Sequence, residues 1–346
     1  MTGILKKAIE ESAKKYPKGG TMYFDDLKSV EVRRISTGLP SLDLIMGGGI
    51  PEGRILEIFG PESSGKTTLA IKFLIECQKT FPKKPVMFID MEHAFDPAYA
   101  TKLGLQMHGD RFLFLQPDSA EQALQEMMHY AGTGEVSGIV LDSVAQLVPM
   151  KEAESTDIGA EMGLRARIMS SAARRLAVIA DNNKCTCFFT NQTRSKLGVM
   201  YGDPETTPGG SALKFAASIR IKTTIKKAKE YENTSEVTMR VIKNKVGVPF
   251  RTTKVLIKYG DGFDYLNDLV TTALLTGIIK KNGPMFMYAD KKWKGQEAMR
   301  EEIIKDEKLQ KEIQEVIANS TTNDVIVEPG AEESEIDFAT GDLKDV

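Results

Sequence analysis

Cysteine and long hydrophobic runs are both scarce in this sequence. Only three cysteines, Cys77, Cys185 and Cys187, occur among 346 residues. An odd and sparse count excludes a disulfide framework and favours a reducing compartment. Cys185 and Cys187 stand too close together, and too far from other ligand residues, for a zinc site. Because they open the apolar run Cys185–Thr190, we interpret them as buried strand residues.

No apolar run reaches the roughly 18 residues that a membrane-spanning helix needs. Residues 1–15 mix lysine and glutamate with isoleucine, leucine and alanine. This pattern predicts an amphipathic helix over about 3–16 and not a signal peptide with an apolar centre. We therefore expect a cytoplasmic protein that does not contact the membrane.

The charge is almost balanced overall but unevenly distributed. The net charge is −2, yet residues 163–227 hold 12 Lys or Arg against three acids, and residues 328–346 hold seven acids against Lys344 alone. A basic middle with an acidic tail is typical of a protein whose tail competes with DNA for one patch. An ordinary solvated surface with a solubilising tail would look the same, so charge alone leaves both interpretations open.

Short apolar runs alternate with helical stretches from Ile35 to about Asp264. Strands that are apolar on both faces and alternate with helices predict an α/β fold with a mostly parallel sheet. The predicted strands are 54–59, 86–90, 138–142 and 186–191, and the predicted helices are 66–79, 120–130 and 164–180. Three further runs, 219–224, 237–242 and 254–259, are candidates for antiparallel strands at one edge.

The pattern divides the chain into four parts. Residues 1–33, a helix followed by a short strand at Thr21–Phe24, are too few to form a core, so they must pack on the main domain or on a neighbouring subunit. Residues 34–266 form the main domain. Residues 267–322 form a small α+β domain that ends in a helix over about 296–318. The acidic residues 323–346 are predicted to be disordered.

A phosphate-binding loop lies between the first predicted strand of the main domain and its helix. The segment matches G-x-x-x-x-G-K-[ST] in full, with a strand before it and a helix after it. Glycines let backbone N–H groups face the phosphates, and the helix N-terminus adds its positive dipole end. Lys66 would reach the β- and γ-phosphates, and Thr67 would bind Mg²⁺. The ATP-binding residues predicted here are Gly60, Pro61, Glu62, Ser63, Ser64, Gly65, Lys66, Thr67 and Thr68.

Two more predicted strands end in acids. Asp142 closes an apolar strand and is a candidate to hold the magnesium shell, directly or through water. Glu92 follows the strand that ends at Asp90 and is the candidate to orient and deprotonate the attacking water. In a parallel sheet both acids lie at the same edge as the phosphate loop.

The motifs together resemble the RecA recombinases of bacteria and their viruses. The resemblance covers about 34–264, continues more weakly beyond, and rests on segments that occur in the family's order: 60–68, 89–94, 95–100, 116–118, 191–192, 198–200, 204–207, 209–210 and 244–245. It implies a RecA-like P-loop NTPase core, a filament on single-stranded DNA, and DNA-dependent ATP hydrolysis in recombination, DNA repair and the SOS response to DNA damage.

The resemblance also implies roles for single residues. Glu92 would be the catalytic carboxylate, and Gln192 would sense the γ-phosphate. Asp96 and Tyr99 would contact adenine. Lys243 and Lys245 would reach the ATP of the neighbouring subunit, with Phe215 at the same interface, and residues 1–33 would dock on the adjacent protomer.

Two loops, 154–163 and 192–210, would line the filament axis and bind DNA without reading its sequence. Arginines and lysines there suit phosphates, apolar residues could wedge between bases, and Tyr201 could stack. Plain packing or a solvated helix face are the alternatives. The first loop looks shortened, and Pro208 stiffens the second. The candidate residues are Met162, Arg167, Arg174, Arg194, Lys196, Leu197, Met200, Tyr201, Gly209 and Gly210.

The sequence therefore predicts an ATPase that uses Mg²⁺, assembles with itself on single-stranded DNA and pairs it with homologous double-stranded DNA. A single-strand-binding protein and a loader are candidate accessory partners. A hexameric helicase with the same P-loop core is one alternative. A nucleotide-gated scaffold that assembles on DNA and signals to a partner is another, and the presence of Glu92 argues for turnover instead.

Overall fold

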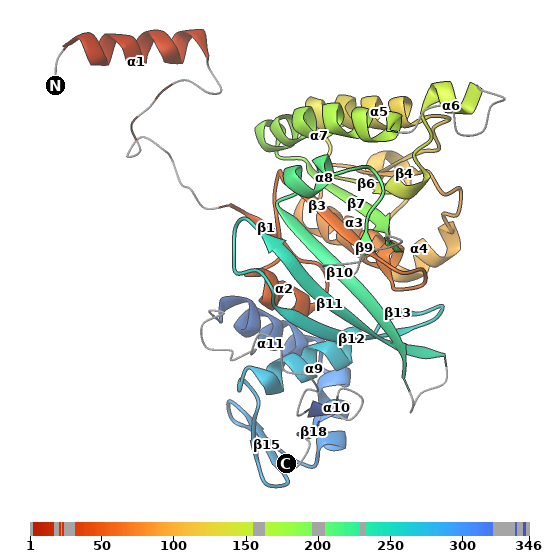
Figure 1. The fold of residues 1–346 in the computed structure, drawn as a ribbon. Helices are drawn as coiled ribbons and strands as arrows, with labels where there is room; N and C mark the ends of the chain where they lie inside the picture. Colours follow the sequence, from red (N-terminus) through yellow and green to blue (C-terminus); the bar gives the residue numbers. More distant parts are fainter. Residues whose placement is uncertain are drawn as a thin grey trace. The chain divides into compact units, whose positions relative to one another are not determined.

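A computed structural model describes residues 3–16, 21, 23, 32–154, 163–195, 205–228, 233–320, 336–337 and 342–343 (Figure 1). Residues 1–33 and 34–346 form two separate compact units. In the first unit, α1 (Gly3–Lys15) has no buried residue. The short strand predicted at Thr21–Phe24 lies largely outside the described residues.

The second unit is built on a nine-stranded sheet with the order β13-β12-β11-β10-β3-β7-β6-β4-β5. Strands β10, β3, β7, β6, β4 and β5 run parallel, whereas β11, β12 and β13 continue the sheet antiparallel beyond β10. The mostly parallel sheet and its antiparallel edge are thus as the sequence predicted. The strand bounds are β3 Ile55–Gly60, β4 Val86–Asp90, β5 Phe112–Leu115, β6 Gly138–Asp142, β7 Thr186–Gln192, β10 Ile219–Lys227, β11 Thr234–Asn244, β12 Thr252–Lys258 and β13 Gly262–Phe263.

Helices cover both faces of the sheet, and each layer closes a separate apolar core. Side chains of α2 (Pro40–Met46), α3 (Lys66–Thr80) and α4 (Pro97–Leu103) pack on one face. Helices α5 (Ala120–Thr133) and α7 (Leu164–Asn183) pack side by side on the other, as Figure 1 shows, together with α8 (Ala212–Ala216). Because neighbouring strand residues point to opposite faces, Phe188 belongs to the first core and Phe189 to the second. All three cysteines are buried, as predicted.

Several short elements were not predicted. They include α2, α4 and β5, and the 3-10 turns η2 (Gly109–Arg111) and η3 (Val144–Gln146). Short pairings also join β1 (Arg34–Ile35) to β2 (Ile50–Pro51), β8 (Arg194–Ser195) to β9 (Glu205–Thr206), and β17 (Ile336–Asp337) to β18 (Asp342–Leu343). Helix α6 (Met150–Glu154) precedes the first predicted DNA loop.

The C-terminal part is α+β, as predicted, with its own core. Its sheet has the order β14-β15-β16 and packs with α9, α10 and α11 around Trp293 and neighbouring apolar side chains. The bounds are α9 Tyr265–Leu275, β14 Lys280–Asn282, β15 Met285–Tyr288, β16 Lys291–Lys294, α10 Gln296–Lys305 and α11 Glu307–Asn319. The single helix predicted over 296–318 is wrong, because Asp306 breaks it and caps α11 by accepting a hydrogen bond from Leu309 N at 3.0 Å.

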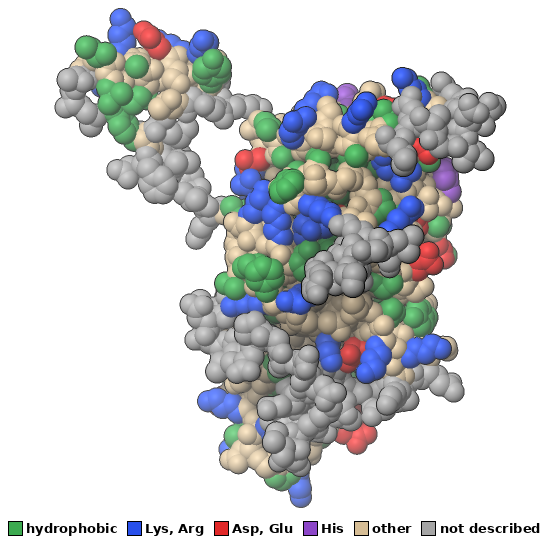
Figure 2. Space-filling view, in the orientation of Figure 1, with side chains coloured by type: hydrophobic (Ala, Val, Ile, Leu, Met, Phe, Trp, Pro, Cys, Tyr) green, Lys and Arg blue, Asp and Glu red, His purple; other side chains and the backbone are tan. Residues whose placement is uncertain are grey.

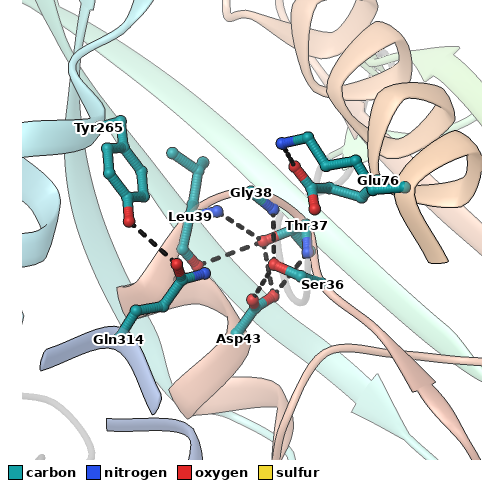
Figure 3. A network of polar contacts seen from close by, with 9 residues as sticks. Ser36, Thr37, Gly38, Leu39, Asp43, Glu76, Tyr265 and Gln314 are labelled. Carbon is teal, nitrogen blue, oxygen red and sulfur yellow. Dashed lines mark hydrogen bonds and ion pairs between the residues drawn. The ribbon is translucent and has the colours of Figure 1, made fainter. Parts of the chain in front are cut away.

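Two acids, the half-buried Asp43 and the buried Asp268, lie where the C-terminal part meets the main domain, and Figure 3 shows Asp43 with its partners. Ser36 Oγ and Thr37 Oγ1 donate to the two carboxylate oxygens of Asp43, at 2.5 and 2.7 Å. On α9, Asp268 accepts from Ser41 N at 3.1 Å. Burial raises the pKa of Asp43 to about 6 and that of Asp268 to about 7.

Among the helices of the described segments, none combines the length and the apolar character that crossing a bilayer demands.

Candidate nucleotide-binding site

The phosphate-loop segment folds as the sequence predicted, between β3 and α3. Gly65 has a φ of +77°, and a Cβ there would lie 2.7 Å from Phe263 Cζ. Both the backbone conformation and the space therefore require glycine. The loop places the N-terminus of the fifteen-residue helix α3 at the edge of the sheet. The first N–H groups of this helix have no partner within the helix and can bind an anion.

The three side chains expected to act on phosphate and metal meet beside this loop. Thr67 Oγ1 donates to Asp142 Oδ2 at 2.6 Å, and Lys66 Nζ donates to the Pro61 carbonyl at 2.5 Å. Burial lowers the pKa of Lys66, and the nearby Asp142 opposes that effect. Burial likewise raises the pKa of Asp142, against hydrogen bonds from Thr190 and Thr67. The three side chains converge because β3 and β6 are parallel and both end at the edge of the sheet that holds the phosphate loop.

Glu92 lies in the loop after β4 and faces the same space. Its Oε1 accepts a hydrogen bond from Ser143 Oγ at 2.6 Å, directly after Asp142. The loop is held by Asp90, whose buried carboxylate accepts from the backbone N–H groups of Glu92 at 3.2 Å and Phe95 at 3.2 Å. Asp90 and Ser143 were not predicted as site residues; their only sequence signal is their place at a strand end.

The cavity beside the phosphate loop has a volume of about 440 Å³. Tyr99 on α4 lines it, and its hydroxyl is 2.9 Å from Thr68 Oγ1. Asp96 caps α4 through Oδ1, which accepts from Ala98 N at 2.8 Å and from Tyr99 N at 3.0 Å. Asp96 therefore stabilises the N-terminus of α4, and its contact with adenine stays a prediction.

One wall of this cavity was missed by the sequence analysis. It comes from the end of β12 and the turn that follows it, at Ile257, Lys258, Tyr259 and Gly260. The turn is fastened to α4, because Asp261 accepts from Lys102 Nζ and pairs with Lys258 Nζ, each at 2.6 Å. A turn flanked by glycines after an apolar strand was the only available signal.

Gln192 ends β7, pairs with Gly60 across the sheet and lines the cavity. The residue before it belongs to a buried polar group that was also missed. Asn191 Nδ2 donates to Glu57 Oε1 at 3.0 Å, and Arg220 Nε donates to Glu57 Oε2 at 2.5 Å. Three strands of the sheet, β3, β7 and β10, are thereby joined next to the cavity.

Lys243, Lys245 and Phe215 come together away from the phosphate loop. Both ammonium groups donate to the Phe215 carbonyl at 3.0 Å, while the Phe215 side chain is 73% exposed. Lys243 pairs with Arg220, which lies beside Glu57 near the middle of β3, several residues before the loop. Burial, followed by the neighbouring charges of Lys245 and Arg220, lowers the pKa of Lys243 to about 8.

Figure 2 shows Lys and Arg side chains gathered over the region of α8, with hydrophobic side chains among them. An exposed phenylalanine beside two cations is the composition expected of a contact surface and not of a packed interior.

The described candidates for DNA contact lie at the ends of the two predicted loops or on α7, which follows the first loop. Arg167 and Arg174 are exposed on α7, seven residues and therefore about two helical turns apart. A Cβ on Gly210 would lie 3.0 Å from Ala166 Cβ, so the end of the second loop packs against the start of α7, where the first loop ends. Arg194 is exposed in β8, which pairs with β9 inside the second loop.

Gly209 and Gly210 have φ values of +87° and +76°. The remaining candidates, Met162, Lys196, Leu197, Met200 and Tyr201, lie outside the described residues.

A phosphate loop between strand and helix, with acids at the ends of neighbouring parallel strands, defines a P-loop nucleotide-binding protein. Comparison with known proteins identifies its family. The model of the RecA N-terminal domain matches residues 3–264. The chain therefore belongs to the RecA family, whose members act in homologous recombination and DNA repair.

Proteins named RecA from several bacteria are similar along most of the chain. That of Chloroherpeton thalassium is 44% identical over 312 residues, covering 88% of this chain and 86% of the relative. That of Chlorobaculum tepidum is 42% identical over 326 residues, covering 92% of each. That of Ruminococcus albus is 43% identical over 297 residues, covering 83% of this chain and 73% of the relative.

Proposed function

We propose that the protein is a DNA-dependent ATPase that assembles as a filament on single-stranded DNA and exchanges it with homologous double-stranded DNA. The observation that carries the proposal is the convergence of Lys66, the Thr67–Asp142 pair and Glu92 at one edge of a parallel sheet. These are the groups that phosphoryl transfer to water needs: a phosphate-binding cation, hard oxygen ligands and a base.

The phosphate loop would bind the nucleotide through the N-terminus of α3 and the Lys66 ammonium. Lys66 Nζ donates to the Pro61 carbonyl at 2.5 Å, and its three N–H donors allow it to donate to a phosphate as well. A charge-assisted hydrogen bond to phosphate is stronger than one to a neutral carbonyl, so phosphate is the preferred acceptor of this ammonium.

Thr67 and Asp142 would hold Mg²⁺. Their hydroxyl and carboxylate oxygens already lie 2.6 Å apart and are the hard oxygen ligands that this ion prefers. Within the described segments, no three His, Cys, Asp or Glu residues are grouped as a metal cage. That fits Mg²⁺, which in nucleotide sites takes one or two protein ligands together with phosphates and water. When bound, the ion would neutralise charge on the phosphates.

Glu92 would accept the proton of the attacking water. Ser143 holds one carboxylate oxygen at 2.6 Å, which orients the group and leaves the other oxygen for the water. Gln192, at the end of β7 on the same cavity, would contact the γ-phosphate, and it begins the second predicted DNA loop. A movement of Gln192 on contact with the phosphate would therefore be passed on to the loop that binds DNA.

Assembly would place ATP between subunits. Lys243, Lys245 and Phe215 lie away from the chain's own phosphate loop, which supports contact with the nucleotide of a neighbour. In this proposal α1, which has no buried residue within its own unit, docks on an adjacent protomer. A single-strand-binding protein and a loader would act as accessory partners.

The deciding experiment measures ATP hydrolysis with and without long single-stranded DNA at several salt concentrations. Stimulation that saturates in proportion to DNA length supports the filament. The log–log salt slope of binding should be about −0.7 per phosphate contact. Lys66→Ala should abolish turnover, and an unchanged rate would remove Lys66 from the mechanism.

Two other results would favour the alternatives. Strong hydrolysis without DNA points to another RecA-like motor, such as a hexameric helicase. ATP binding with no hydrolysis in either condition points to a nucleotide-gated scaffold.

A further inference from the structure

Thr223 on β10 lies directly behind the phosphate loop. The pairing of Lys222 with Phe59 places the next residue, Thr223, beside Gly60. Thr223 is fully buried, as is Ser64 inside the loop. The two hydroxyl oxygens are 2.8 Å apart. A residue 159 positions away in sequence is thus bonded to the loop expected to hold phosphate.

The neighbouring acceptors favour one direction for this contact. Ser64 Oγ donates to the Pro61 carbonyl at 2.8 Å. A serine hydroxyl has one proton, so while Ser64 donates to Pro61 the contact with Thr223 is one in which Thr223 donates and Ser64 accepts. The alternative acceptor for Thr223, the Phe59 carbonyl, is more distant at 3.3 Å. The chain of donors therefore runs from Thr223 through Ser64 to Pro61.

The start of the loop is also fitted to Thr223 sterically. A Cβ on Gly60 would lie 2.1 Å from Thr223 Oγ1 and 2.5 Å from the Thr223 carbonyl oxygen. No side chain larger than hydrogen fits at Gly60, where the loop leaves the sheet. The loop thus has a fixed wall behind it.

We propose that Thr223 is a positioning residue of the phosphate loop. It holds Ser64, and through Ser64 the Pro61 carbonyl, in a fixed orientation beside Lys66. This inference rests on the proposed nucleotide binding. No role for Thr223 follows from the P-loop motif, because β10 lies far from the loop in sequence.

Valine in place of Thr223 has almost the same shape but cannot donate. Ser64 would lose its hydrogen-bond donor, and the Ser64–Pro61 contact would no longer be held from β10. Loss of one buried hydrogen bond corresponds to a rise of about threefold to tenfold in the Kd for ADP and in the KM for ATP. Since the loop contacts ground state and transition state alike, kcat at saturating ATP should stay within about twofold.

The test compares Thr223→Val, Thr223→Ser and Thr186→Val in the full-length protein, with fluorescent ADP titration, ATPase kinetics and thermal unfolding without nucleotide. Thr186 is the matched control, because it is a buried threonine of the same sheet that accepts from Gly53 N at 3.0 Å at the opposite edge. We expect the valine variant at 223 to bind ADP more weakly, serine to restore binding, and the control to lose stability without losing affinity.

Equal ADP affinity of Thr223→Val and the parent would overturn the inference, and so would an equal loss in Thr186→Val. Thr223→Ala provides the same comparison if the valine variant does not fold. Failure of the unmodified protein to bind ADP would instead overturn the proposed function, which separates the two outcomes.

Discussion

The buried ion pair between Glu57 and Arg220 offers a sharp test of how the sheet supports the site. Glu57 is fully buried, and the Arg220 side chain is 10% exposed. Arg220 also stacks on Phe59 at 4.6 Å, and Asn191 donates to the second oxygen of Glu57. Glu57→Gln keeps the shape and removes one charge, so the guanidinium is left buried without its partner.

Removing one member of a buried pair costs about 3–5 kcal/mol, because the remaining charge is desolvated and uncompensated. For a large domain this corresponds to a fall in Tm of roughly 6–20 °C. The measurement is thermal unfolding of the protein without nucleotide or DNA. Asp181→Asn is the control: its ion pair with Lys184 is exposed, and its loss should cost less than about 1 kcal/mol.

A double variant separates the lost attraction from the buried charge. Glu57→Gln with Arg220→Met removes both charges and should recover part of the lost stability. If Glu57→Gln alone unfolds within about 2 °C of the parent, the pair does not hold the three strands together and the reasoning fails.

Two further predictions concern pH and assembly. Burial raises the pKa of Asp268 from 3.8 to about 7, so the folded state keeps a proton that the unfolded chain releases. Stability should therefore fall as pH rises from about 4 to about 7. Asp268→Asn should remove up to about 2 kcal/mol of the fall between about pH 5.5 and about pH 8, and urea unfolding with unchanged pH dependence would contradict this. Phe215→Ala truncates an exposed side chain, so it should change stability by less than about 0.5 kcal/mol. It should nevertheless raise the protein concentration needed for assembly about tenfold or more, measured by light scattering. Assembly at the parent's concentration would exclude Phe215 from the interface.

The sequence alone determined the features that depend on neighbouring residues. The runs 54–59 and 66–79 predicted a strand and a helix on either side of the phosphate loop at 60–68, and β3 and α3 lie there. Alternating apolar runs predicted the parallel sheet, and that topology placed Asp142 and Glu92 at the edge beside Lys66. Helical periodicity alone was not sufficient, because it predicted one helix over 296–318. The structure has two helices there, which are separated at Asp306, where the Asp306 side chain caps the second.

Only the tertiary structure decided which distant residues support the site. Thr223 reaches Ser64 from another strand, Arg220 meets Glu57 across the sheet, and Tyr259 completes the cavity from the turn after β12. None of these residues belongs to a motif, because their position depends on strand order and register. Those are set by the packing of two apolar cores on opposite faces of the sheet, a property of the whole chain and not of any one segment.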